Sequence, residues 1–161
     1  MIASAVLVGL AAACSSPNAN DRFLATMPDR ASFAVVADAL EHRCGSLDCH
    51  GTIYRNLRIY GHEGLRLDPN GRPSSQPNTT TAEYDADYQA VVGLEPEILS
   101  AVVSSGGQGP ERLTLVRKAL GLEAHKGGTL WTAGDVQDTC FRSWLTGATD
   151  VASCQAVLNI P

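Results

Sequence analysis

The sequence has few aromatic residues, no excess of basic residues and no long apolar run. Aromatics make up 6% of the 161 residues, so the core must depend mainly on Leu, Val and Ala. Basic residues number 12 against 17 acidic ones, and the formal net charge is −5. This balance argues against a nucleic-acid-binding protein, because such proteins neutralise phosphates with Lys and Arg. No stretch approaches the roughly 18 apolar residues that a membrane-spanning helix needs. The chain therefore suits one domain.

Cysteine, by contrast, is present in an odd number, five, which raises the question of where each thiol goes. The first, Cys14, follows a short apolar run that ends in small residues, and a polar Ser/Pro/Asn stretch follows it. This segment resembles a bacterial lipoprotein signal, in which the chain is cut before the cysteine and the thiol is lipidated. The alternative is a buried N-terminal helix. A start codon placed too far downstream would explain why no Lys or Arg opens the segment.

The lipoprotein resemblance implies a particular organisation and location. Residues 1–13 would be the signal peptide, 14–30 a flexible tether lipidated at Cys14, and 31–161 the folded domain. The protein would lie in the bacterial cell envelope, anchored by lipid alone to the periplasmic or outer face of the outer membrane. Export would place the other four cysteines in an oxidising compartment.

Hydrophobic periodicity and capping residues predict a mainly α domain with long loops. Acidic residues on these helices, Asp85, Asp87, Glu95 and Glu97, are expected to face solvent. The long loops fall at 68–81, 104–110 and 121–134. Six helices are predicted, at Asp29 to Arg43, Thr80 to about Val92, Pro96 to Val103, Glu111 to Leu120, Asp135 to Leu145, and Val151 to Leu158.

The strongest chemical signal is a pair of cysteines followed directly by a histidine: Cys44, four intervening residues, Cys49 and His50. A Cys pair with an adjacent His is the sequence cue for covalent haem attachment, usually with two intervening residues. Each thiol adds to a haem vinyl group, and the histidine becomes an axial ligand of the iron. A disulfide between Cys44 and Cys49 is the first alternative. A zinc site is the second, although the spacing fits no common zinc pattern.

Further short motifs extend this signal along the chain. Cys49-His50-Gly51 is followed by Gly64-Leu65-Arg66-Leu67-Asp68, and His125-Lys126-Gly127-Gly128 is followed by Ser143-Trp144-Leu145-Thr146-Gly147-Ala148. In this order, over about residues 31–148, the chain resembles the cytochrome c-like domains of exported bacterial proteins of the planctomycete type. The resemblance implies a helical cytochrome c-like domain with covalent haem c, in which a C-terminal helix bearing Trp144 crosses the first helix. It also implies a carrier of single electrons between redox partner proteins rather than an enzyme. The alternative is a cofactor-free, disulfide-stapled lipoprotein that acts as a binding or structural module.

A haem iron held by His50 would need a second axial ligand or would remain five-coordinate. His125 is the preferred candidate because its loop comes late in the chain, where class I cytochromes deliver their distal ligand. His62 is the alternative, whereas His42 and Met27 are excluded by their positions before the cysteine pair. Tyr54, Arg55, Arg58 and Tyr60 are expected at the haem edge or near its propionates, or simply on the surface.

The remaining cysteines, Cys140 and Cys154, lie on the last two predicted helices with Gly147 between them. A helical hairpin brings such positions together, so a disulfide is predicted. A redox-active dithiol is the alternative, but the Cys-x-x-Cys spacing is absent.

Overall fold

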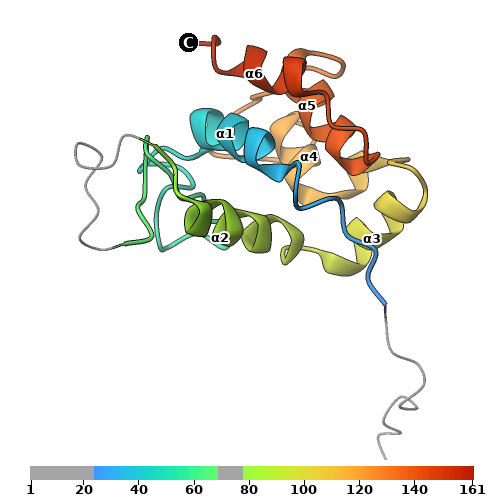
Figure 1. Cartoon of the computed structure of the whole chain (residues 1–161). Helices are drawn as coiled ribbons and strands as arrows, with labels where there is room; N and C mark the ends of the chain where they lie inside the picture. Colours follow the sequence, from blue (N-terminus) through green and yellow to red (C-terminus); the bar gives the residue numbers. More distant parts are fainter. Residues whose placement is uncertain (1–23, 69–77) are drawn as a thin grey trace, which may run out of the picture.

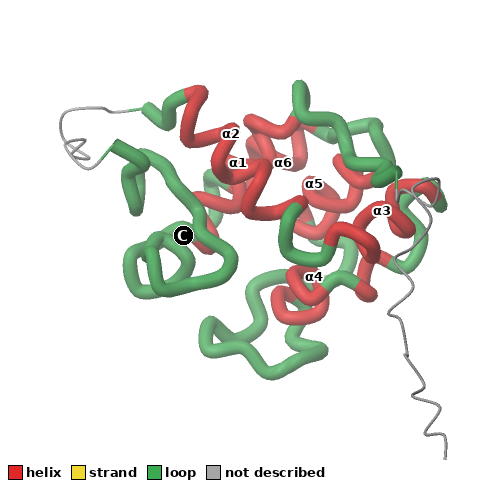
Figure 2. Tube along the Cα trace, turned by 90° about the horizontal axis from the view of Figure 1, so that it is seen from below, coloured by secondary structure: helices red, strands yellow, loops and turns green. Residues whose placement is uncertain are grey.

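The computed structural model describes residues 24–68 and 78–161, and within these ranges the protein is mainly α (Figure 1). The only β pairing in the described ranges is an isolated bridge between Tyr60 and Leu65. Figure 2 shows helices joined by long loops, as the sequence predicts. The helices are α1 (Phe33–Cys44), α2 (Thr81–Val92), α3 (Pro96–Ser104), a 3-10 turn η1 (Pro110–Arg112), α4 (Thr114–Ala119), α5 (Val136–Leu145) and α6 (Val151–Val157).

Helix α1 is the central element of the domain. It contacts α2 on one side and the α5–α6 pair on the other (Figure 1). Val36, Ala37 and Leu40 are almost completely buried, as the i, i+3, i+4, i+7 pattern from Phe33 predicts. The helix ends at Cys44, so the first cysteine of the proposed site is held in place by the core.

Five of the nine aromatic residues, Phe33, Tyr88, Trp131, Phe141 and Trp144, form one cluster of ring contacts. The ring centroid of Trp144 on α5 lies 4.9 Å from that of Phe33 on α1 and 5.6 Å from that of Phe141. Its indole Nε1 donates a hydrogen bond to the backbone oxygen of Asp29 at 2.7 Å. The predicted contact between the C-terminal helix and the first helix through Trp144 is present.

The predicted disulfide between Cys140 and Cys154 is confirmed, with the two Cα atoms 4.7 Å apart. Both cysteines are buried. Gly147, in the turn between α5 and α6, has a φ of 78°, which favours glycine and lets the chain reverse. The disulfide therefore fixes the helical hairpin that packs on α1.

The residues just before α1 are attached to the domain. Thr26 N–H donates to Ser100 Oγ at 2.8 Å, and the Tyr88 hydroxyl donates to the Pro28 carbonyl at 3.0 Å. The C-terminal end of the predicted tether (14–30) thus packs on helices α2 and α3 rather than hanging free. Cys14 and the predicted signal peptide lie outside the described residues.

Local capping accounts for where several helices begin. Thr80 and Glu83 form the predicted capping box at the start of α2. The helix predicted over 111–120 is instead divided into η1 and α4, because Leu113 has an extended conformation. The Glu95 carboxylate accepts bonds from the backbone N–H and hydroxyl of Thr114 there, at 2.6 and 2.9 Å.

One expectation about charge was wrong. Asp87 does not face solvent: it is 0% exposed, because its side chain points from α2 toward the loop that follows α1. Its neighbour Asp85 is half-exposed and pairs with Arg30. Residues two apart lie on opposite sides of a helix, and Asp87 shares the buried side of α2 with Glu83 and Val91.

Candidate functional site

The segment from Cys44 to Gly51 is folded back on itself by backbone hydrogen bonds. His50 N–H donates to the Cys44 carbonyl at 2.9 Å, and the N–H groups of Cys49 and Gly51 both donate to the Ser46 carbonyl at 2.9 Å. The four residues between the cysteines therefore form a compact turn. As a result Cys44, Cys49 and His50 all line one cavity.

Close backbone packing explains the glycine that follows His50. A Cβ atom at Gly51 would lie 2.0 Å from the Gly45 carbonyl oxygen, and one at Gly64 would lie 2.1 Å from the same atom. No side chain fits at either position without moving the backbone. The glycines of the two short motifs thus hold the turn against the loop at 61–65.

The cavity has a volume of about 640 Å³, within the size range of small-molecule and cofactor sites. Residues from two distant parts of the chain form it: the turn after α1 on one side, and α4 with the loop at 124–131 on the other. Its large apolar lining residues are Leu40, Leu57, Leu94, Leu115, Leu130 and Trp131.

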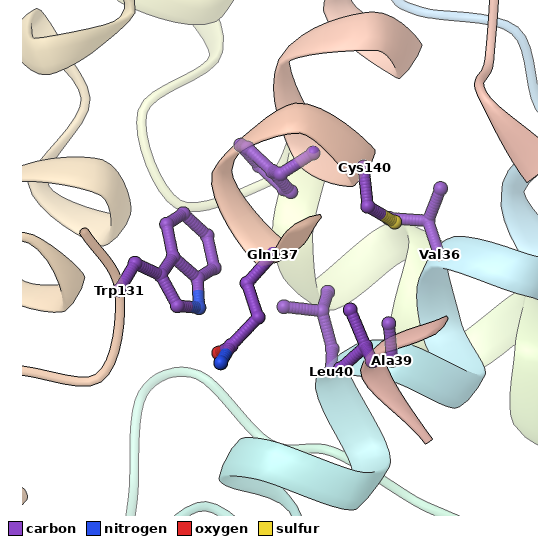
Figure 3. A pocket seen from close by; sticks show the side chains of 8 residues that line it. Val36, Ala39, Leu40, Trp131, Gln137 and Cys140 are labelled. Carbon is purple, nitrogen blue, oxygen red and sulfur yellow. The ribbon is translucent and has the colours of Figure 1, made fainter. Parts of the chain in front are cut away.

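A second, much smaller cavity of about 10 Å³ lies behind this lining, between α1 and α5. Leu40 and Trp131 border both cavities. Figure 3 shows Gln137 of α5 between these two side chains. The small cavity has room for no more than about one water molecule, so the larger one is the candidate ligand site.

The cavity brings His50 and His125 together although 74 residues lie between them in the sequence. Their ring centroids are 6.0 Å apart and their planes are inclined by 25°. Each ring uses Nδ1 for a backbone carbonyl, that of Leu57 at 2.9 Å for His50 and that of Gly128 at 3.4 Å for His125. Because a carbonyl only accepts, Nδ1 carries the proton in both rings and the Nε2 lone pair is available.

This arrangement suits two metal ligands. Ligating histidines characteristically donate their other ring N–H to a carbonyl or carboxylate. Burial lowers the pKa of His50, with His125 and Arg55 adding to the effect, so its ring is neutral at neutral pH as a ligand must be. Two imidazoles that bind one metal atom from opposite sides, with bonds of about 2.0 Å, also have centroids about 6 Å apart.

Neither thiol near His50 forms a disulfide within the described residues: Cys44 is free and buried, and Cys49 is free and half-buried. Burial raises the pKa of the Cys44 thiol to about 12, so at neutral pH it is not the thiolate that a reactive redox cysteine requires. In the part of the chain described, no group of three or more His, Cys, Asp or Glu side chains is placed to hold a metal ion. The zinc alternative thus finds no ligand set there, whereas a porphyrin brings four nitrogen ligands of its own.

The other candidate ligands are engaged elsewhere. His62 contacts the buried Glu41 carboxylate at 3.1 Å and the Thr79 hydroxyl at 3.1 Å. His42 contacts the Ile160 carbonyl at 2.7 Å and Glu63 at 3.2 Å. Met27 packs against the core. None of these three side chains lines the cavity.

Charged side chains surround the cavity unevenly. Arg55, Lys118 and Lys126 line it, with Asp48 as the one acidic residue of the lining. The predicted neighbours Tyr54 and Arg55 are thus at the cavity, whereas Arg58 and Tyr60 are not in its lining. The sequence did not predict that Lys118 and the apolar residues of α4 line the cavity, because a short helix of ordinary composition carries no motif.

Comparison with known proteins supplies no relative: no family model, curated protein or solved structure matches this chain. Among the described residues no helix has the length and apolar character needed to cross a membrane. Inferences about function therefore depend on the residues and their arrangement.

Proposed function

We propose that the protein is a monohaem c-type cytochrome that carries single electrons between redox partner proteins of the bacterial cell envelope. The observation that carries the proposal is one cavity lined by Cys44, Cys49, His50 and His125. A covalent haem c needs two thiols next to one axial histidine, and these are grouped here in that relation. The proposal includes lipidation at Cys14 as the only attachment to the membrane.

The residues present fit a haem group in three respects. The apolar lining suits the macrocycle, and the cavity has the size of a cofactor site. Arg55 and Lys126 are cations able to pair with propionates, whereas Lys118 is already paired with Glu123 at 3.0 Å. In both histidines Nδ1 is hydrogen-bonded to a backbone carbonyl, so the Nε2 lone pair is free to bind a metal.

When bound, haem would supply a one-electron redox centre. In this proposal Cys44 and Cys49 would hold the group covalently, and His50 and His125 would be the residues that bind its iron. Two histidine ligands favour a lower reduction potential than a histidine and a methionine, because the thioether ligand raises it. The apolar walls contributed by Trp131 and Leu40 limit water at the centre.

The test is production of the chain in cells that contain the cytochrome c maturation system. We expect the intact mass to include one haem and a pyridine haemochrome spectrum of the c type. The Cys44→Ser/Cys49→Ser variant should lose covalent haem, whereas the matched Cys140→Ser/Cys154→Ser variant should retain it. Haem-free wild type with a Cys44–Cys49 disulfide would support the cofactor-free lipoprotein instead.

A second test concerns the distal ligand. We expect the oxidised wild-type protein to be low-spin and the His125→Ala variant to become high-spin. His62→Gln is the matched control, because His62 is equally a loop histidine but is engaged with Glu41. A high-spin wild type, or a low-spin His125→Ala protein that turns high-spin only with His62→Gln, would contradict the assignment of His125.

A further inference from the structure

Asp87 is a fully buried carboxyl group that the proposed site does not use. One of its oxygens, Oδ1, accepts a hydrogen bond from the Tyr60 N–H at 2.7 Å. The other, Oδ2, has no hydrogen-bond partner among the described residues. Since a buried carboxylate with an unsatisfied oxygen is costly, this geometry favours a bound proton.

A short stretch of backbone connects Asp87 to His50. The Leu57 carbonyl accepts from His50 Nδ1, and the Ile59 N–H donates to the His50 carbonyl, both at 2.9 Å. Tyr60, the next residue, donates to Asp87. Because three residue steps of chain span at most about 10 Å, Asp87 lies within about 15 Å of the His50 ring.

Other charged groups near Asp87 reinforce its proton affinity. Burial is the largest of the causes that raise the pKa of Asp87 to about 8; Glu41 from α1 and Glu83 from α2 also raise it, while the hydrogen bond from the Tyr60 N–H lowers it. The cation of this region, Arg66, is paired with Glu83 at 2.9 Å. His62 contacts Glu41, and with its side chain 41% exposed it connects the cluster to solvent.

We propose that Asp87 is a redox-linked proton site. It binds one proton from solvent when the His50–His125 site gains an electron, and it releases that proton when the electron leaves. This inference depends on the proposed haem function. The protein would then transfer an electron and a proton together over part of the pH range.

The balance is one electron and one proton. The electron comes from the reducing partner protein and goes to the iron, and the proton comes from water and converts the Asp87 carboxylate to the carboxylic acid. Reduction removes one positive charge from the metal centre, which makes a nearby carboxyl bind its proton more tightly. At about 15 Å and an effective dielectric constant near 20, the proton affinity changes about five- to tenfold.

The experiment measures the midpoint potential of the haem-loaded protein between pH 6 and 10. We expect the potential to fall as pH rises through about 8, by an amount equivalent to a five- to tenfold change in proton affinity. For a one-electron couple a tenfold change corresponds to 59 mV. The Asp87→Asn variant, which keeps an acceptor for the Tyr60 N–H, should lose this fall.

Asp85→Asn is the matched control: it makes the same substitution on the same helix, but the Asp85 side chain is 47% exposed and paired with Arg30. It should keep the wild-type pH dependence.

A second measurement needs no haem. The carboxyl groups of the haem-free protein are titrated by carbon-13 NMR, and Asp87→Asn identifies the signal of Asp87. This signal should titrate near pH 8.

The outcomes separate the two proposals. A haem-loaded protein whose potential is the same function of pH in wild type and Asp87→Asn overturns the proton site and leaves the cytochrome proposal standing. A chain that takes up no haem, recognised from its mass, overturns both. An Asp87 carboxyl that titrates near pH 4 in the haem-free protein also overturns the proton site.

Discussion

The two sides of the domain that meet at α1 are built in contrasting ways. On the α5–α6 side, Trp144, Phe141 and the Cys140–Cys154 disulfide fill the space except for a cavity of about 10 Å³. On the other side, the turn after α1 and the α4 region enclose a cavity of about 640 Å³ lined by two thiols and two imidazoles. On the closed side, the rings around Trp144 pack against one another, whereas thiol and imidazole side chains face a cavity on the other side.

The largest expected effect is on the closed side. Trp144→Ala should lower the free energy of unfolding by about 3–5 kcal/mol, because it removes a fully buried indole from the aromatic cluster. Denaturant unfolding of the haem-free protein measures it. Tyr54→Ala, at the cavity and 88% exposed, should change stability by no more than about 0.5 kcal/mol. Equal losses would refute the contrast between the sides.

The disulfide should come next. Cys140→Ser/Cys154→Ser should lose about 3 kcal/mol of unfolding free energy, since the bond closes a loop of about 15 residues in the unfolded chain. Its sequence separation is 14. Thermal unfolding with and without reductant checks the value, because the reduced wild type should match the variant. Unchanged stability would mean that the hairpin holds without the covalent bond.

The free energy of unfolding should also depend on pH through Asp87. The raised pKa of Asp87 means that the folded protein holds its proton to about pH 8, while the unfolded chain releases it near pH 4. The contribution of Asp87 is therefore fully present below about pH 4 and is lost as pH rises to about 8, by up to about 1.4 kcal/mol per pH unit.

Asp87→Asn has no such titration, so it should gain stability relative to wild type between pH 5 and 7. Urea unfolding at several pH values measures this difference. A constant difference between the two proteins over that range would show that Asp87 is ionised in the fold.

The smallest effect on stability, with a clear spectroscopic result, is expected at Gly127. A Cβ atom there would lie 2.9 Å from Cε1 of the His125 ring, so Gly127→Ala should displace the ring. The haem-loaded variant should show a larger high-spin fraction, with unfolding free energy changed by less than about 1 kcal/mol. Leu122→Ala, exposed in the same loop, is the control and should remain low-spin.

Helix positions and the disulfide were predictable because they depend on local spacing. The capping box of Thr80 and Glu83, the buried stripe of α1 and the pairing of Cys140 with Cys154 follow from short-range patterns. The break at Leu113 and the burial of Asp87 did not follow, because each depends on a side chain or loop far along the chain.

The sequence by itself determined a mainly α chain and a Cys44–Cys49–His50 group, since helical periodicity and motif spacing are local properties. It left His125 and His62 as competing partners for His50. Only the tertiary structure decided that His125 and His50 line the same cavity and that His62 is held by Glu41. The physical reason is that loops carry no periodicity: where their side chains meet is set by the helices that hold their ends and by close backbone contacts such as Gly51 against Gly45.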